Sequence, residues 1–273
     1  MRLMLVGCGK MGGAMLEGWL DDGLPPANVT IVDPAANKPE ATWLSAWRDR
    51  GVLVVEQAGA VPSGQTPDVV LFAVKPQVID ALISEYKEFA EQGALVLSVV
   101  AGKTISFFEE ALGAQTAVVR TMPNTPAAVG RGMTVLCANA LVPDRMKEQC
   151  AKLLSAVGET AWIEDEALMD AVTGVSGSGP AYIFHMAEAL AEAGVAAGLP
   201  RELAVQLANA TVSGAGELLR QSPDTPATLR QNVTSPGGTT QAGLNVLMHD
   251  EKGLVPLMTA VVDAAAKRSR ELS

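Results

Sequence analysis

The feature that most constrains the fold is a change of pattern near residue 160. Before this point, short and nearly continuous apolar runs alternate with amphipathic stretches, beginning with "RLMLVG" at residues 2–7. Such runs predict strands buried on both faces of a mostly parallel sheet, with helices packed over it. After residue 160 the pattern is helical and no clear strand remains. We therefore expect an α/β domain over residues 1–160 and an all-α domain over residues 161–273.

The other elements of the first domain follow from the same pattern. Strands are expected at 29–33, 52–55, 68–74, 94–100, 116–122 and 132–139, and helices at 10–23, 41–51, 77–92, 105–113 and 143–158. In the second domain, "VTGVSGSGPAY" (Val172–Tyr182) interrupts a long helical tract with three glycines. It predicts a kink where a partner helix or a ligand approaches closely, and packing is the commoner of the two reasons.

Charge and composition exclude several classes of protein. The net charge of −10 argues against a nucleic acid or an anionic membrane as partner. Three separated cysteines and two histidines offer no metal-ligand spacing, so no metal site is predicted, and His185 and His249 are assigned to helix packing. The chain shows no signal peptide and no apolar run of the roughly 18 residues that a membrane span needs. We expect a cytoplasmic protein with reduced thiols.

The first expected strand leads into "GCGKMG", which fits G-x-G-x-x-G between a strand and a helix. Gly7 permits the tight turn, Gly9 lets the backbone approach a pyrophosphate, and Gly12 lets the helix pack on the strand. Asp33 ends the next strand, where a carboxylate suits the free ribose hydroxyls of NAD and repels a 2′-phosphate. The nearby Lys38 and Asn37 could hold that phosphate instead, so the spacing leaves the choice between NADH and NADPH open.

Two further strand ends carry candidate ligand contacts. "AVKPQ" (Ala73–Gln77) follows the strand at 68–74, at the sheet edge where open α/β sheets bind ligands. Its Lys75 faces a cofactor, a substrate or solvent. "TMPNTPAAVG" (Thr121–Gly130) has two prolines that stiffen a loop suited to a wall of a nicotinamide pocket, although such loops also serve as simple corners.

Near the C-terminus, "SPGGTT" (Ser235–Thr240) opens a helix with two glycines. Inside a helix, glycine is worse than alanine by about 0.5–1 kcal/mol, so the pair needs a reason. With Ser235 as N-cap and Pro236 as first helical residue, Gly237 and Gly238 leave the backbone N–H groups of the first turn uncovered. Such a helix start predicts a small anion site of the size of a carboxylate.

In this order, "GCGKMGGAM", "AVKPQ", "MPNTPAAVG", "AVTGVSGSGPAY" and "NVTSPGGTTQAGL" resemble the pyrroline-5-carboxylate reductase family over the whole chain. The resemblance implies reduction of 1-pyrroline-5-carboxylate to L-proline, the last step of proline biosynthesis, with NADPH or NADH as hydride donor. It also implies a Rossmann-type domain followed by a helical dimerisation and substrate-binding domain. Helices of two subunits interleave in this family, and many members assemble five dimers into a decamer.

Carried over motif by motif, the resemblance assigns roles to particular residues. Gly7, Gly9, Lys10, Met11 and Gly12 bind the pyrophosphate. Ala73, Val74, Lys75 and Pro76 line the nicotinamide side, with Asn124 in the adjacent loop. Asp33 remains the ribose contact that the strand spacing indicates. Ser235, Gly237, Gly238, Thr239 and Thr240 hold the substrate carboxylate, and Thr240 also bonds the ring nitrogen, so Thr240 and Lys75 are the expected catalytic residues. The family favours NADPH, yet "VDPAANK" lacks the Ser/Asn-Arg pair that marks this preference.

Two other classes of function compete with this assignment. A 3-hydroxyacid dehydrogenase or a general imine reductase has the same two-domain pattern. The dehydrogenase needs a catalytic lysine on a C-terminal helix, and residues 163–246 contain no Lys. A non-catalytic NADP(H) sensor would not need a carboxylate site such as Ser235–Thr240. Turnover of pyrroline-5-carboxylate separates all three.

Overall fold

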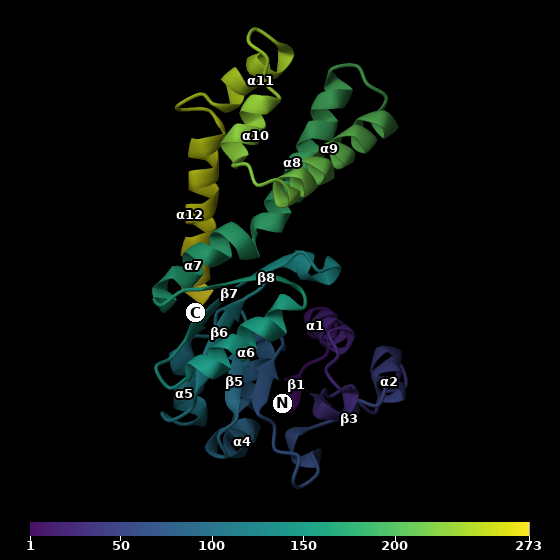
Figure 1. Cartoon of the computed structure of the whole chain (residues 1–273), viewed down its shortest axis with the longest axis vertical. Helices are drawn as coiled ribbons and strands as arrows, with labels where there is room; N and C mark the ends of the chain where they lie inside the picture. The colour runs from purple at the N-terminus through teal and green to yellow at the C-terminus, as the bar shows by residue number, and fades with distance from the viewer. Residues whose placement is uncertain (273) are drawn as a thin grey trace. The chain divides into compact units, whose positions relative to one another are not determined.

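The computed structural model describes residues 1–272, which form two compact units. The first unit is Met1–Gly177 together with the chain from Ala266 onward, and the second is Ser178–Ala265. The first contains the sheet and the second is helical (Figure 1), which confirms the predicted order of an α/β region followed by helices.

The sheet of the first unit has eight strands in the order β3-β2-β1-β4-β5-β6-β7-β8. They are β1 (Leu3–Val6), β2 (Val29–Val32), β3 (Leu53–Val55), β4 (Val69–Phe72), β5 (Leu95–Ser98), β6 (Val118–Met122), β7 (Gly132–Ala138) and β8 (Gly158–Trp162). The first six strands are parallel, and β7 runs antiparallel to β6. The order 3-2-1-4-5-6 is that of the dinucleotide-binding Rossmann fold, whose ligand lies where the order reverses, here between β1 and β4.

Helices cover both faces of this sheet. They are α1 (Lys10–Asp21), α2 (Thr42–Asp49), α3 (Pro76–Leu82), α4 (Lys87–Glu91), α5 (Ile105–Leu112) and α6 (Asp144–Ser155), with α7 (Met169–Val172) at the end of the unit. Along β1 the side chains alternate between two hydrophobic cores: Leu3 and Leu5 pack under α1, α2 and α6, whereas Met4 and Val6 pack under α3, α5 and α7. This two-sided burial is why the strands read as continuous apolar runs.

One predicted helix differs from the structure, and one strand was not predicted. The helix expected at 77–92 is divided into α3 and α4 by a 3-10 turn, η3 (Ile83–Tyr86), whose spacing of three residues turns both Ile83 and Tyr86 into the core. Strand β8 was not predicted, because "GETAW" is a half-exposed edge strand with no apolar run. It pairs with β7 at Gly132 and Gly158, where the two backbones lie too close for a side chain.

The first unit continues to Gly177 before the chain enters the second unit, 17 residues beyond the boundary predicted at 160. The chain after residue 160 still belongs to the sheet: Trp162 pairs with Leu136 in β7, and the side chain of Met169 is 0% exposed in the second core. The roles assigned to the two domains stay predictions.

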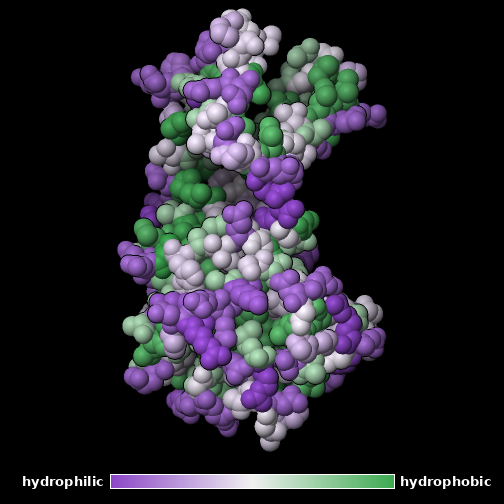
Figure 2. All heavy atoms as spheres, in the orientation of Figure 1, coloured by the Kyte–Doolittle hydropathy of each residue, from purple (hydrophilic) through white to green (hydrophobic). Residues whose placement is uncertain are grey.

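The second unit consists of α8 (Gly179–Ala196), α9 (Arg201–Gln221), α10 (Pro226–Asn232), α11 (Thr239–Leu247) and most of α12 (Leu254–Leu272). Helices α8 and α9 pack on each other through small side chains, and the buried hydrophobic residues between 178 and 265 are Ala191, Ala204 and Ala208. Large hydrophobic side chains remain exposed, such as Phe184 (64%) and Val255 (76%). Figure 2 shows hydrophobic atoms at the surface of this unit. A unit of this kind lacks a hydrophobic core of its own.

Candidate functional site

The glycine turn after β1 has the geometry that its sequence predicts. Gly7 has φ +87° and its N–H donates to the Val32 carbonyl at 2.9 Å. A Cβ on Gly12 would lie 2.5 Å from the Gly7 carbonyl oxygen, so only glycine lets α1 lie this close to the strand end. A Cβ on Gly9 would meet nothing within 4 Å in residues 1–272. The turn is therefore tight on its inner side and open on its outer side.

The start of α1 leaves backbone donors available at this turn. The first bond of the helix is from Gly13 N–H to the Gly9 carbonyl, at 2.8 Å. The amides of Lys10, Met11 and Gly12 precede that bond, and no acidic residue lies in the first turn. An uncovered helix start of this kind suits a phosphate, so the described residues fit the pyrophosphate of a dinucleotide.

Asp33 lies beside the turn and is held by two backbone amides. Its carboxylate accepts from Cys8 N–H and from Ala35 N–H, each at 2.9 Å. Asn37, which the sequence offered for a 2′-phosphate, uses one of its two amide donors on the carboxylate of Glu56, at 2.9 Å. Asp33 therefore joins the end of β2 to the glycine turn, a role that sequence spacing did not indicate.

The end of β4 contacts the same turn. A Cβ on Gly7 would lie 2.8 Å from Val74 Cγ1 and 3.1 Å from the Ala73 carbonyl oxygen. Lys75 is exposed and is the N-cap of α3, and Pro76 is the first residue of that helix. The structure thus brings Gly7, Ala73 and Val74 together at the point where the strand order reverses.

The loop after β6 is fixed by Asn124, which begins the 3-10 turn η4 (Thr125–Val129). The Asn124 carbonyl oxygen of the side chain accepts from Met133 N–H at 2.9 Å, and its amide donates to Ser176 Oγ at 3.2 Å. Helix α1 packs on η4, so this loop belongs to the same region as the glycine turn. The predicted break at Val172–Tyr182 is present as a π-helix, Thr173–Gly177, and it carries Ser176.

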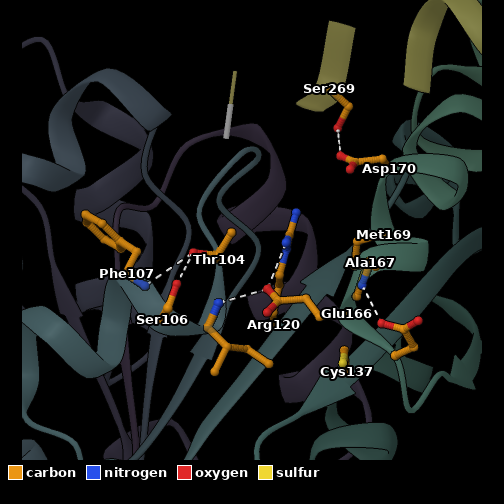
Figure 3. A network of polar contacts seen from close by, with 12 residues as sticks. Thr104, Ser106, Phe107, Arg120, Cys137, Glu166, Ala167, Met169, Asp170 and Ser269 are labelled. Atoms are coloured by element: carbon orange, nitrogen blue, oxygen red, sulfur yellow. Dashed lines mark hydrogen bonds and ion pairs between the residues drawn. The ribbon is translucent and has the colours of Figure 1, made fainter. Parts of the chain in front are cut away.

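An ion pair with a buried arginine, which the sequence analysis did not select, joins β6 to the segment after β8 (Figure 3). Arg120 is 4% exposed, and its Nη1 donates to Glu166 Oε1 at 2.8 Å. Its Nη2 is buried without a hydrogen-bond partner in residues 1–272. An unpaired buried donor costs about 1–3 kcal/mol, so the position is unusual. The signal in the sequence was a single charge inside the apolar strand "TAVVRTM".

The "SPGGTT" stretch of the second unit forms a turn before its helix, and the predicted cap is wrong. Helix α11 begins at Thr239 with Gly238 as N-cap, not at Pro236 with Ser235 as N-cap. Gly238 N–H donates to the Ser235 carbonyl at 2.9 Å and Gly237 has φ +71°. Proline followed by a glycine of positive φ is typical of a type II turn. Because Pro236 and Gly237 form this turn, the helix begins after it.

The uncovered helix start predicted for this stretch is nevertheless present. Within α11 the first bond is from Ala242 N–H to the Gly238 carbonyl, at 3.2 Å. The amides of Thr239 and Thr240 precede it, no acidic residue lies in the first turn, and both threonines are exposed. A carboxylate can reach these donors without passing a side chain at Gly237 or Gly238.

The two histidines lie outside these groups, whereas Cys8 lies in the glycine turn and its N–H donates to Asp33. Within one chain the histidines do not pack between helices: His185 is 81% exposed and pairs with Glu188, while His249 Nδ1 accepts from Glu251 N–H at 3.2 Å in the turn after α11. Burial, with the nearby Asp33 carboxylate, raises the pKa of the Cys8 thiol to about 12. Cys8 therefore stays a neutral thiol and is no nucleophile.

A sheet of this topology with a glycine turn at its reversal point is the dinucleotide-binding domain of NAD(P)-dependent oxidoreductases, and the chain is of that class. It is 43% identical over 276 residues to a pyrroline-5-carboxylate reductase of Arabidopsis thaliana, which covers 100% of this chain and 95% of the relative. The corresponding enzyme of Pseudomonas aeruginosa is 38% identical, covering 100% and 97%. The chain belongs to the pyrroline-5-carboxylate reductase family.

Solved structures and family models agree with this assignment. A pyrroline-5-carboxylate reductase of Coxiella burnetii has TM-score 0.90 at 33% identity, covering 100% of this chain and 98% of that one. The Plasmodium falciparum enzyme, solved with NADP bound, has TM-score 0.79 at 29% identity, covering 99% and 97%. Residues 2–102 match a model described as NADP oxidoreductase, coenzyme F420-dependent, and residues 166–272 match pyrroline-5-carboxylate reductase dimerisation.

The dimerisation model explains why the second unit exposes its hydrophobic side chains. The chain forms a homo-oligomer in which residues from 166 onward take part, and exposed apolar patches of this kind mark such surfaces. Among residues 1–272, no helix has both the length and the apolar character to cross a membrane.

Proposed function

We propose that the chain reduces 1-pyrroline-5-carboxylate to L-proline with a hydride from NADPH, with NADH as the possible alternative donor, and so completes proline biosynthesis. The observation that carries this proposal is the uncovered N-terminus of α11 behind the turn Ser235–Gly238. A small carboxylate needs such donors, and they occur in a family whose named members are pyrroline-5-carboxylate reductases.

In this proposal the coenzyme is held by the glycine turn and the strand ends around it. Gly7, Gly9, Lys10, Met11 and Gly12 hold the pyrophosphate, Asp33 lies at the ribose, and Ala73, Val74, Lys75, Pro76 and Asn124 line the nicotinamide side. The open outer side of Gly9 supports this assignment, since a Cβ there would meet no atom within 4 Å among the described residues. Bound there, the reduced nicotinamide supplies the hydride.

The substrate is held by its carboxylate at Ser235, Gly237, Gly238, Thr239 and Thr240. The Thr240 hydroxyl bonds the ring nitrogen and so orients the imine carbon, and Lys75, at the start of α3, is the second candidate catalytic residue. Hydride adds to the imine carbon, and the electron pair of the C=N π bond returns to the nitrogen, which already carries its proton. Because the substrate enters as the iminium, the reaction needs orientation and no strong general acid.

We further propose that dimers of this chain assemble into a decamer and that the enzyme works in the cytoplasm. The small buried core of the second unit, which consists of alanines, supports an interface that completes it. Light scattering of the purified protein at several concentrations tests the assembly. A single species of 28.3 kDa, the mass of one chain, would contradict it.

The activity is tested by giving the purified protein racemic pyrroline-5-carboxylate with NADPH or NADH. We expect coenzyme oxidation together with L-proline, measured by chiral chromatography, and a higher kcat/KM with NADPH. Binding of coenzyme without any proline would refute the assignment of substrate. Proline formation with a higher kcat/KM for NADH would refute the choice of NADPH alone.

A further inference from the structure

The segment 166–177 follows the last strand of the sheet and ends with the π-helix that precedes α8, and its first half is anchored in the core. Glu166 Oε1 accepts both from Arg120 Nη1 and from Ile105 N–H, each at 2.8 Å, so one carboxylate oxygen joins the segment to β6 and to the start of α5. The side chain of Met169, in the same segment, is fully buried. Figure 3 shows Arg120 and Glu166 facing each other, and Asp170 bonded to Ser269 of α12.

The second half of the segment contacts the loop after β6. Here the chain is a π-helix, Thr173–Gly177, in which Ser176 accepts the Asn124 side-chain amide at 3.2 Å. One residue further, a Cβ on Gly177 would lie 3.3 Å from Met122 Sδ, so the segment passes close to the end of β6. Ser176 therefore contacts the loop, and the neighbouring Gly177 lies close to the strand end that precedes it.

Asn124 is held from both sides by these contacts. Its side-chain oxygen accepts from Met133 N–H at 2.9 Å, and its amide donates to Ser176. The orientation of this amide is thus set by β7 and by the π-helix together. Without the Ser176 hydroxyl, one of the two contacts is lost and the amide can rotate.

We propose that Ser176 is a positioning residue, which fixes Asn124 and the loop 121–130 from the anchored segment 166–177 so that the nicotinamide side of the coenzyme site keeps one geometry. The proposal rests on the proposed function, in which Asn124 lines that side. Ser176 itself touches neither coenzyme nor substrate in this account.

Two local features argue that the segment exists for position and not for stability. The ion pair adds little to stability because Arg120 loses its hydration on burial, while the Glu166 side chain stays 29% exposed. Arg120 Nη2 also lacks a hydrogen-bond partner in residues 1–272. A π-helix is rare and is found frequently at functional sites. Unfavourable local features such as these two are expected to occur together at functional sites.

The test compares Ser176→Ala with Thr173→Val, which also removes a hydroxyl from the π-helix. The Thr173 hydroxyl donates to the Met169 carbonyl at 2.8 Å and does not contact the loop. We expect Ser176→Ala to lower kcat about tenfold, with substrate KM changed less than about twofold. Thr173→Val should keep the wild-type kcat, and Ser176→Thr, which retains a hydroxyl, should recover most of it.

A double-mutant cycle with Asn124→Asp tests the pair directly. This change removes the donor to Ser176 and keeps the acceptor of Met133 N–H. In the Ser176→Ala background, Asn124→Asp should cost clearly less in kcat than in the wild type. Two effects that multiply independently would overturn the proposal.

Hydrogen exchange gives a readout that does not depend on activity. Ser176→Ala should speed exchange in peptides that cover residues 121–130, and Thr173→Val should not. Wild-type exchange and wild-type kcat in Ser176→Ala would refute the positioning role while leaving the proposed function intact. A wild-type protein that forms no proline would instead refute the proposed function, and the exchange comparison would still decide the role of Ser176.

Discussion

The chain uses glycine to open two helices, α1 and α11, and the surroundings of the glycines differ. At α1 the glycines fit the protein's own packing: Cβ atoms on Gly7 and Gly12 would lie within 2.8 Å of neighbouring atoms. At α11, Gly237 meets nothing within 4 Å in residues 1–272, and its φ of +71° alone requires glycine. The glycine turn before α1 is tightly packed against its own unit, whereas the turn before α11 presents backbone donors at an open surface.

The largest expected effect comes from filling the packed turn. In Gly12→Ala the new Cβ lies 2.5 Å from the Gly7 carbonyl oxygen, so α1 must move away from the strand. We expect Tm to fall by about 5 °C or more, from an overpacking cost of about 1–3 kcal/mol. Coenzyme affinity should fall with it.

Gly13→Ala is the matched control, because a Cβ there meets nothing within 4 Å among the described residues. In the helix interior it should be neutral or stabilising by up to about 1 kcal/mol. Thermal unfolding and coenzyme titration of both variants measure the contrast. Equal Tm values for the two would show that α1 tolerates movement and that the turn is not tightly packed.

The next effect concerns the open turn, where function and stability should separate. In Gly237→Ala the left-handed backbone costs about 1–2 kcal/mol, and movement of the turn displaces the amides of Thr239 and Thr240. We expect substrate KM to rise about tenfold or more, with coenzyme affinity changed less than about twofold.

Gly243→Ala, inside α11, is the control for this change, since a Cβ there also meets nothing within 4 Å in residues 1–272. It should keep the wild-type KM and raise Tm slightly. An unchanged KM in Gly237→Ala would place the carboxylate site elsewhere and remove the functional half of the comparison.

Thr240→Val and Thr239→Val test whether the two threonines at the start of α11 have separate roles. If the Thr240 hydroxyl orients the ring nitrogen, its loss should lower kcat about tenfold, more than it raises KM. Thr239 lies at the carboxylate rim, so its loss should raise KM and spare kcat. Initial-rate kinetics over both substrates measures this, and identical patterns in the two variants would show that neither threonine has a separate role.

The smallest expected effect is on coenzyme choice at the packed turn. Asp33→Ser removes a charge that repels a 2′-phosphate, so the NADPH/NADH ratio of kcat/KM should rise about threefold to tenfold. It also removes an acceptor of Cys8 N–H, so affinity for both coenzymes should fall. Asp33→Asn, which keeps one acceptor, should change the ratio with less loss of affinity. A constant ratio would show that Asp33 serves the turn alone.

Much of the geometry around the glycine turn followed from the sequence because its signals are local. Continuous apolar strands, Gly7 at the end of the first of them and Asp33 at the end of the second are each set by a few neighbouring residues. The start of α11 was misplaced, although Pro236 and Gly237 already carried the turn signal.

The sequence by itself determined the doubly covered sheet, the glycine turn at its reversal point and the presence of an uncovered helix start. The tertiary structure alone decided the pairings over long distances: Arg120 with Glu166 across 46 residues, and Asn124 with Ser176 across 52. It also decided that "GETAW" becomes the edge strand β8. The physical reason is that a backbone turn or a two-sided apolar strand is set by adjacent residues, whereas a side-chain hydrogen bond needs a partner that only folding brings within about 3 Å.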